Sequence, residues 1–78
     1  HGQDVTLTEM EYQILLLLIS NPRKVFSVQE IYETIWKEMF FPNSGNTVMV
    51  HIRNIRRKLE KNGESYIQNI WGRGYCVN

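Results

Sequence analysis

The stretch "VMVHIRNIRRKLEK", residues 48–61, combines a regular apolar pattern with five basic residues. At about 100° per residue, its apolar side chains at i, i+4, i+7 and i+11 fall within a narrow arc of a helix. These are Val48, Ile52, Ile55 and Leu59. The pattern predicts a helix from about Asn46 to Lys61, closed near Gly63, because glycine readily adopts the left-handed conformation that ends many helices.

The far side of this predicted helix contains no acidic residue between Asn46 and Leu59. A helix face that merely meets solvent usually mixes acidic and basic residues in i, i+4 pairs. The far side is formed by Asn46, Thr47, Val50, Arg53, Asn54, Arg57 and Lys61, and the apolar stripe is flanked by His51, Arg56 and Lys58. Small groups between arginines suit a helix in the DNA major groove, where side chains contact base edges, thymine methyl groups and phosphates.

The same helix has two other interpretations. One is a solvated face that is basic by chance. The other is a helix lying on a membrane, which needs bulky apolar residues free to enter lipid, whereas here the narrow stripe is needed for the core. The nucleic-acid interpretation accounts for more of the pattern, and we expect no membrane partner.

Composition indicates one small globular domain of 78 residues with a net charge of only +1. The charge is unevenly placed: residues 1–45 carry −3 and residues 46–78 carry +4. The second half is therefore suited to an anionic partner. The single cysteine, Cys76, cannot form an internal disulfide, which fits a reducing compartment, and we expect a cytoplasmic protein. The longest apolar run, residues 14–19, is too short to span a bilayer.

Two capping boxes predict two earlier helices. Thr8 with Glu11 predicts a helix from about residue 9 to residue 20, and Ser27 with Glu30 predicts one from about residue 28 to residue 38. Because the run of residues 14–19 points all round its helix, we expect the first helix to be buried on more than one side.

The C-terminal stretch "SYIQNIWGRGYCVN" holds two short β-prone runs around "WGRG", which predicts a hairpin with Arg73 at its tip. A tip arginine can enter a minor groove or pair with phosphate, although it can equally be an ordinary solvated turn residue. Helices followed by a basic hairpin form a winged helix. The N-terminal "QDVTLT" is extended and β-branched, so it is a candidate strand beside the helices.

"LTEMEYQILLLL", "QEIYETIW", "NTVMVHIRNIRRKLE" and "YIQNIWGRGYCV" together resemble the DNA-binding effector domain of OmpR/PhoB-type response regulators. The resemblance extends from Val5 to Val77. It implies an α+β, mainly α, winged helix-turn-helix that controls transcription in a two-component system. The third helix would enter the major groove and the hairpin wing would lie at the minor groove.

The resemblance also implies partners. Such domains commonly bind direct-repeat DNA as a dimer, and the segment Lys37 to Asn43 corresponds to a loop that can contact RNA polymerase. Phe40 and Phe41 fit either that surface or the core. Members usually begin with a four-stranded sheet, of which only "QDVTLT" is present, so residues 1–78 are expected to be one domain cut from a longer regulator. Loss of the sheet predicts an exposed apolar patch on the first helix and a tendency to self-associate.

The family often has arginine where Trp71 stands, which leaves Arg73 as the candidate wing arginine. We expect Val50, Arg53 and Asn54 to contact base edges. The residues expected at phosphates or in the wing groove are Thr47, His51, Arg56, Arg57, Lys58 and Arg73.

No catalytic constellation, metal-ligand spacing or phosphate-binding glycine loop is present in the sequence. His51 and Cys76 are too few for a metal site. We therefore expect no enzyme activity, no metal and no cofactor. An alternative from another class is a winged helix that binds a protein through its third helix or through residues Phe40 to Pro42.

Overall fold

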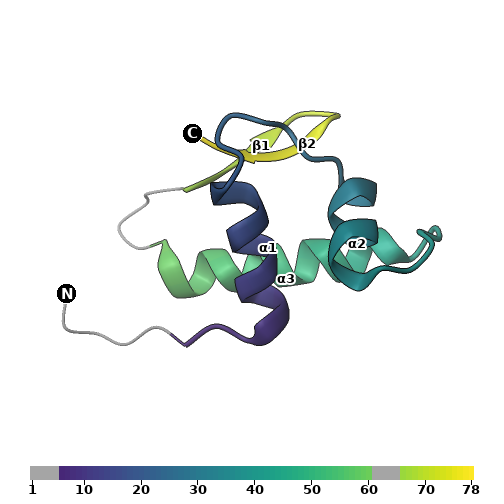
Figure 1. Cartoon of the computed structure of the whole chain (residues 1–78). Coiled ribbons are helices and arrows are strands. Elements are labelled where there is room, and N and C mark those ends of the chain that lie inside the picture. Colours follow the sequence, from purple (N-terminus) through teal and green to yellow (C-terminus); the bar gives the residue numbers. More distant parts are fainter. Residues whose placement is uncertain (1–5, 61–65) are drawn as a thin grey trace.

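Three helices are followed by a two-stranded antiparallel hairpin in a computed structural model that describes residues 6–60 and 66–78. The elements are α1 (Glu9–Ile19), α2 (Val28–Trp36), α3 (Ser44–Leu59), β1 (Ile67–Ile70) and β2 (Gly74–Val77). Figure 1 shows α3 crossing α1 and α2 on one side, with the hairpin at the opposite ends of these two helices. The expected order of elements is confirmed.

Both predicted capping boxes are present. At α1, the Glu11 N–H donates to Thr8 Oγ1 at 3.2 Å, and the Thr8 N–H donates to Glu11 Oε1 at 3.0 Å. At α2, Ser27 and Glu30 make the same reciprocal pair at 2.9 and 3.0 Å. The ends differ slightly from expectation, since α2 stops at Trp36, where the next residue, Lys37, takes a left-handed conformation with φ of 58°.

Helix α3 starts two residues earlier and ends two residues earlier than the sequence predicted. At its start, Ser44 Oγ accepts a hydrogen bond from the N–H of Phe41 at 3.0 Å, which fixes the chain as it enters the helix. At its end, Glu60 is extended and its carboxylate accepts the N–H of Tyr66 at 2.9 Å, so the chain leaves the helix toward β1. The predicted closure at Gly63 lies outside the described residues.

The core lies where α3 crosses the other helices. The predicted stripe is confirmed: Val48, Ile52 and Ile55 are buried, and Leu59 packs half-buried against them. The residues that complete this core from the other segments are Ile14, Leu18, Phe26, Ile31, Ile67 and Tyr75. Burial of these side chains is the main favourable term that holds α3 in place.

Helix α1 packs against α2, α3 and β2, and Leu15 and Leu17 are partly buried on either side of Ile14, so the expected burial on more than one side is confirmed, but the outer face is open. Tyr12, Leu16 and Ile19 follow one another along its outer face and are 52%, 43% and 49% exposed. This is the apolar patch expected if no sheet covers α1. Residues 6–8 form no strand, and the remainder of the predicted N-terminal strand, residues 3–5, lies outside the described residues.

The hairpin is joined to the helical body through the segment before α2. β1 pairs with β2 in a register that places Ile67 opposite Val77. Phe26 then forms an antiparallel bridge with Tyr75, with backbone hydrogen bonds of 2.8 and 2.9 Å. As expected, glycines allow the turn: Gly72 and Gly74 have φ of +75° and +147°. The wing is thus fixed to the start of α2.

Candidate nucleic-acid interface

The outer face of α3 is exposed and basic. Val50 is 52% exposed, and the side chains of Arg53 and Arg57 are exposed beside it. Thr47 and Asn54 are half-buried on the same helix. At about 100° per residue, Val50, Arg53 and Arg57 lie opposite the buried stripe, where they can reach a ligand without disturbing the core.

One flank of α3 faces α1 and α2 and is engaged inside the domain. Lys58 Nζ lies 2.6 Å from Glu11 Oε1 on α1. The ring of His51 packs edge-on against Trp36 of α2, with centroids 5.2 Å apart. His51 Nδ1 lies 2.7 Å from the carbonyl oxygen of Thr47, which requires a hydrogen on Nδ1 because a carbonyl only accepts.

Glu11 is the buried acid of this flank. Burial alone would raise the pKa of its carboxyl, but the hydrogen bond from Lys58, the Thr8 N–H and the charge of Lys58 together lower the pKa below its usual value of 4.5. The carboxylate is therefore charged at neutral pH, and the pair with Lys58 is an ion pair.

The other flank of α3 faces the hairpin. Arg56 Nη2 donates to the carbonyl oxygen of Ile67 at 2.7 Å and to Asn69 Oδ1. Its guanidinium also lies 5.7 Å from the ring centroid of Tyr75. Glu60, one turn later, contacts Arg56 at 3.9 Å. Arg56 thus connects α3 to both strands of the wing.

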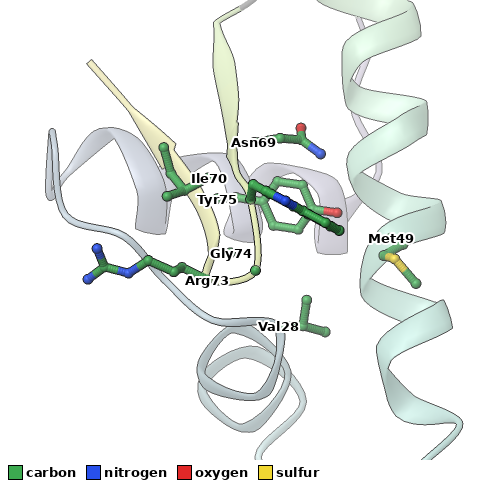
Figure 2. A pocket seen from close by; sticks show the side chains of 9 residues that line it. Val28, Met49, Asn69, Ile70, Arg73, Gly74 and Tyr75 are labelled. Atoms are coloured by element: carbon green, nitrogen blue, oxygen red, sulfur yellow. The ribbon is translucent and has the colours of Figure 1, made fainter.

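A groove of about 430 Å³ separates the hairpin from α3. Its lining residues are Val28, Met49, Asn69, Ile70, Trp71, Gly72, Arg73, Gly74 and Tyr75. Figure 2 shows Met49 on α3 across from the hairpin, while Arg73 extends away from α3 on the far side of the hairpin tip. Arg73 would therefore contact a different part of a ligand from the part that the basic residues of α3 contact.

The structure thus separates the predicted site residues into three groups. Thr47, Val50, Arg53, Asn54 and Arg57 belong to the outer face of α3, and Arg73 is exposed at the wing. The head groups of His51, Arg56 and Lys58 have partners inside the domain. The DNA roles assigned to all of these residues stay predictions.

Sequence reasoning missed two residues at this surface. Met49 is 44% exposed and lines the groove, but its apolar side chain was not included among the candidates. Asn69 Oδ1 accepts a hydrogen bond from Arg56, but no local sequence pattern predicts this contact because the two residues lie on different elements. Helical phase was the available signal for Met49, which stands four residues before Arg53 and so shares its side of the helix.

Among residues 6–60 and 66–78, no group of histidine, cysteine and acidic side chains is placed to hold a metal ion. None of the helices in the described ranges is long and apolar enough to cross a bilayer.

Three helices, a basic outer face on the third and a hairpin joined to the second define a winged helix-turn-helix domain. The chain belongs to the family of C-terminal domains of transcriptional regulatory proteins, which matches residues 2–77. The resemblance to OmpR/PhoB-type effector domains is therefore confirmed. Membership of a regulatory family also supports the expectation that the domain is not an enzyme.

Individual proteins agree with this assignment. The uncharacterized transcriptional regulatory protein YrkP of Bacillus subtilis is 47% identical over 75 residues, which is 94% of this chain and 32% of YrkP. The response regulator DrrB, an OmpR/PhoB homolog of Thermotoga maritima, superposes with a TM-score of 0.82 at 33% identity, covering 97% of this chain and 35% of DrrB. The DNA-binding domain of the response regulator AdeR, solved in complex with an intercistronic region, superposes with a TM-score of 0.77 at 32% identity. The match covers 95% of this chain and 76% of the AdeR chain. The chain spans about a third of the length of the curated relatives it matches.

Proposed function

We propose that this domain binds double-stranded DNA sequence-specifically, as the output domain of a two-component response regulator that controls transcription. The observation that carries the proposal is the acid-free outer face of α3, where Val50, Arg53 and Arg57 are exposed. Helix α3 lies in the major groove and the wing lies at the minor groove. The DNA-bound structure of the AdeR domain supports this partner.

The residues take separate roles in the proposed complex. Val50, Arg53 and Asn54 contact base edges, and Thr47, Arg57 and Arg73 contact phosphates or the wing groove. Three further candidates lie nearer the edges of this surface: His51, Arg56 and Lys58. Because their side chains already have partners within the domain, their main role is to position α3 and the wing. If one of these three residues contacted a phosphate, its charged or polar head group would have to do so while keeping its partner within the domain.

The rest of the proposal concerns the whole regulator. Residues 1–78 form one domain of a longer cytoplasmic protein, and two such domains bind direct-repeat DNA as a dimer. The linker between α2 and α3 contacts RNA polymerase, which its surface supports: Met39 and Phe41 are 70% and 59% exposed, whereas Phe40 is half-buried against Tyr32. The same exposed side chains favour a second candidate function, a protein-interaction winged helix.

The salt dependence of duplex binding tests the proposal. With about four phosphates neutralised per domain, the logarithm of the association constant falls against the logarithm of salt concentration with a slope of about −3.6. Selection from a random duplex pool then returns one shared sequence. No duplex binding, or a slope near zero, together with salt-insensitive binding to a protein, would favour the second candidate.

A further inference from the structure

The side chain of Trp71 is 97% exposed, more than any other large apolar side chain that the structure describes. Single exposed apolar residues are ordinary on protein surfaces. Trp71 differs in its position, because it stands at the tip of the hairpin and lines the groove whose opposite wall is formed by α3. It is therefore displayed at the surface where the proposed ligand binds.

The turn that carries Trp71 is held on both sides. The N–H of Arg73 donates to the carbonyl oxygen of Ile70 at 2.8 Å, which closes the turn. Immediately after it, β2 is joined to Phe26 by the bridge at Tyr75. A side chain on a fixed turn loses little backbone freedom when it binds, so this geometry suits a contact residue.

The groove that Trp71 lines is apolar on its α2 and α3 side, and the outer face of α3 next to Met49 is cationic. Met49, 44% exposed, and Val28 line the same groove. Next to Met49 around the helix, Arg53 and Arg57 are exposed on the outer face of α3. A ligand that fits both parts must be an anion with apolar surface, and duplex DNA has both in its phosphates and its deoxyribose rings.

We propose that Trp71 is an apolar DNA contact, whose indole packs on deoxyribose rings and base edges while Arg57 of α3 pairs with a phosphate. The inference rests on the proposed DNA binding and specifies how the wing takes part in it. An indole supplies a large rigid apolar surface together with one N–H donor. Because it releases no counterions, this contact raises affinity without changing the salt slope.

Fluorescence tests the contact directly. The chain has two tryptophans, and Trp36 is stacked on Tyr32 with ring centroids 5.1 Å apart. Trp36→Phe keeps an aromatic ring in that stack and leaves Trp71 as the only tryptophan. In this variant, addition of a duplex that carries the selected sequence should shift the emission to shorter wavelength and lower the quenching by acrylamide, a neutral quencher.

Binding measurements test its energetic role. Trp71→Ala should lower duplex affinity about tenfold at every salt concentration, leaving the slope unchanged. Trp71→Phe should restore most of the loss, which a general disturbance of the hairpin would not do. The matched control is Phe41→Ala, since Phe41 is 59% exposed but lies on the α2–α3 linker and lines no part of this groove.

The outcomes separate this inference from the proposed function. If duplex binding shows the expected salt slope but Trp71 remains as accessible to acrylamide as in the free domain, the inference fails and the function stands. If no duplex binds, both fail. Shielding of Trp71 that grows with protein concentration in the absence of DNA would overturn the inference in favour of contact with a second copy.

Discussion

Lys58 Nζ, in the last turn of α3, lies 2.6 Å from Glu11 Oε1, in the first turn of α1. The Glu11 side chain is only 4% exposed, whereas that of Lys58 is 35% exposed. Glu11 shares the buried face of α1 with Ile14 and Leu18, so its carboxylate is directed at α3 and requires a cation there. The pair fixes the C-terminal part of the proposed recognition helix against the rest of the domain.

Replacing Lys58 should therefore cost stability. Lys58→Ala leaves the buried Glu11 carboxylate with the Thr8 N–H but without its cation, and should lower the free energy of unfolding by about 1 to 3 kcal/mol. Urea unfolding measures the change. The control is Arg57→Ala, an exposed neighbour on the same helix, which should stay within about 0.5 kcal/mol of the parent. Equal stabilities for the two variants would contradict a structural role for Lys58.

The lowered pKa of Glu11 makes this contribution dependent on pH. Because the folded pKa lies below the usual value of 4.5, the unfolded chain takes up the proton first as the pH falls. The stabilisation is present above pH 4.5 and is lost as the pH falls through the folded pKa. Urea midpoints measured at several pH values between about 6 and 3 should fall less steeply for Glu11→Gln than for the parent. Glu33→Gln is the control at an exposed acid, and a pH profile of Glu11→Gln parallel to that of the parent would rule out this role.

The features predicted correctly from the sequence are those set by nearby residues. Each capping box joins residues three apart, so Thr8 with Glu11 and Ser27 with Glu30 are visible in any short window. The core stripe of α3 follows from helical periodicity alone. The hairpin follows from two β-prone runs around the glycines at 72 and 74, which take positive φ as expected.

The features that were missed depend on contacts between distant segments. Glu11 and Lys58 are 47 residues apart, so their ion pair has no local signature. Helical phase places Arg56 beside the core stripe and Arg57 on the far side, but only the position of β1 makes Arg56 a contact of the wing. The exact set of exposed residues on α1 has no local signature either, because an all-apolar run does not tell which of its sides a neighbouring element covers.

The contrast between Arg56 and Arg57 gives a test of the proposed interface. Arg57→Gln should reduce the magnitude of the salt slope by about 0.9, since one phosphate contact is lost. In a background that carries Arg73→Gln, which removes the phosphate contact of the wing itself, Arg56→Gln should leave the slope unchanged while lowering affinity, because it releases β1 from α3 and so misplaces the wing. Duplex affinity is measured at several salt concentrations for both variants. A reduced slope for Arg56→Gln would show that this guanidinium pairs with phosphate in the complex.

The outer face of α1 predicts weak self-association of this domain. Tyr12, Leu16 and Ile19 form a half-exposed apolar row on one helix face. Sedimentation equilibrium at high protein concentration should reveal dimers, and Leu16→Glu should reduce them by placing a charge within the row. Met39→Glu, at a residue that is 70% exposed on the α2–α3 linker, is the control. A strict monomer at high concentration would refute the prediction.

Gly74 sets how closely the wing approaches the helical body. A Cβ at this position would lie 2.0 Å from the carbonyl oxygen of Phe26, and φ of +147° disfavours any side chain. Gly74→Ala should therefore break the bridge between Phe26 and Tyr75 and lower the free energy of unfolding by about 2 kcal/mol or more.

The matched control for Gly74 is Gly72, in the same hairpin turn. Gly72 has φ of +75°, but a Cβ there would meet no atom within 4 Å. Gly72→Ala should cost only the left-handed backbone strain of about 1 kcal/mol, as measured by thermal or urea unfolding. The turn that contains Trp71 leads directly into β2, so a displaced β2 also displaces Trp71. Gly74→Ala should therefore lower duplex affinity more than Gly72→Ala does. Equal losses of stability for the two variants would mean that the contact with Phe26 does not hold the wing.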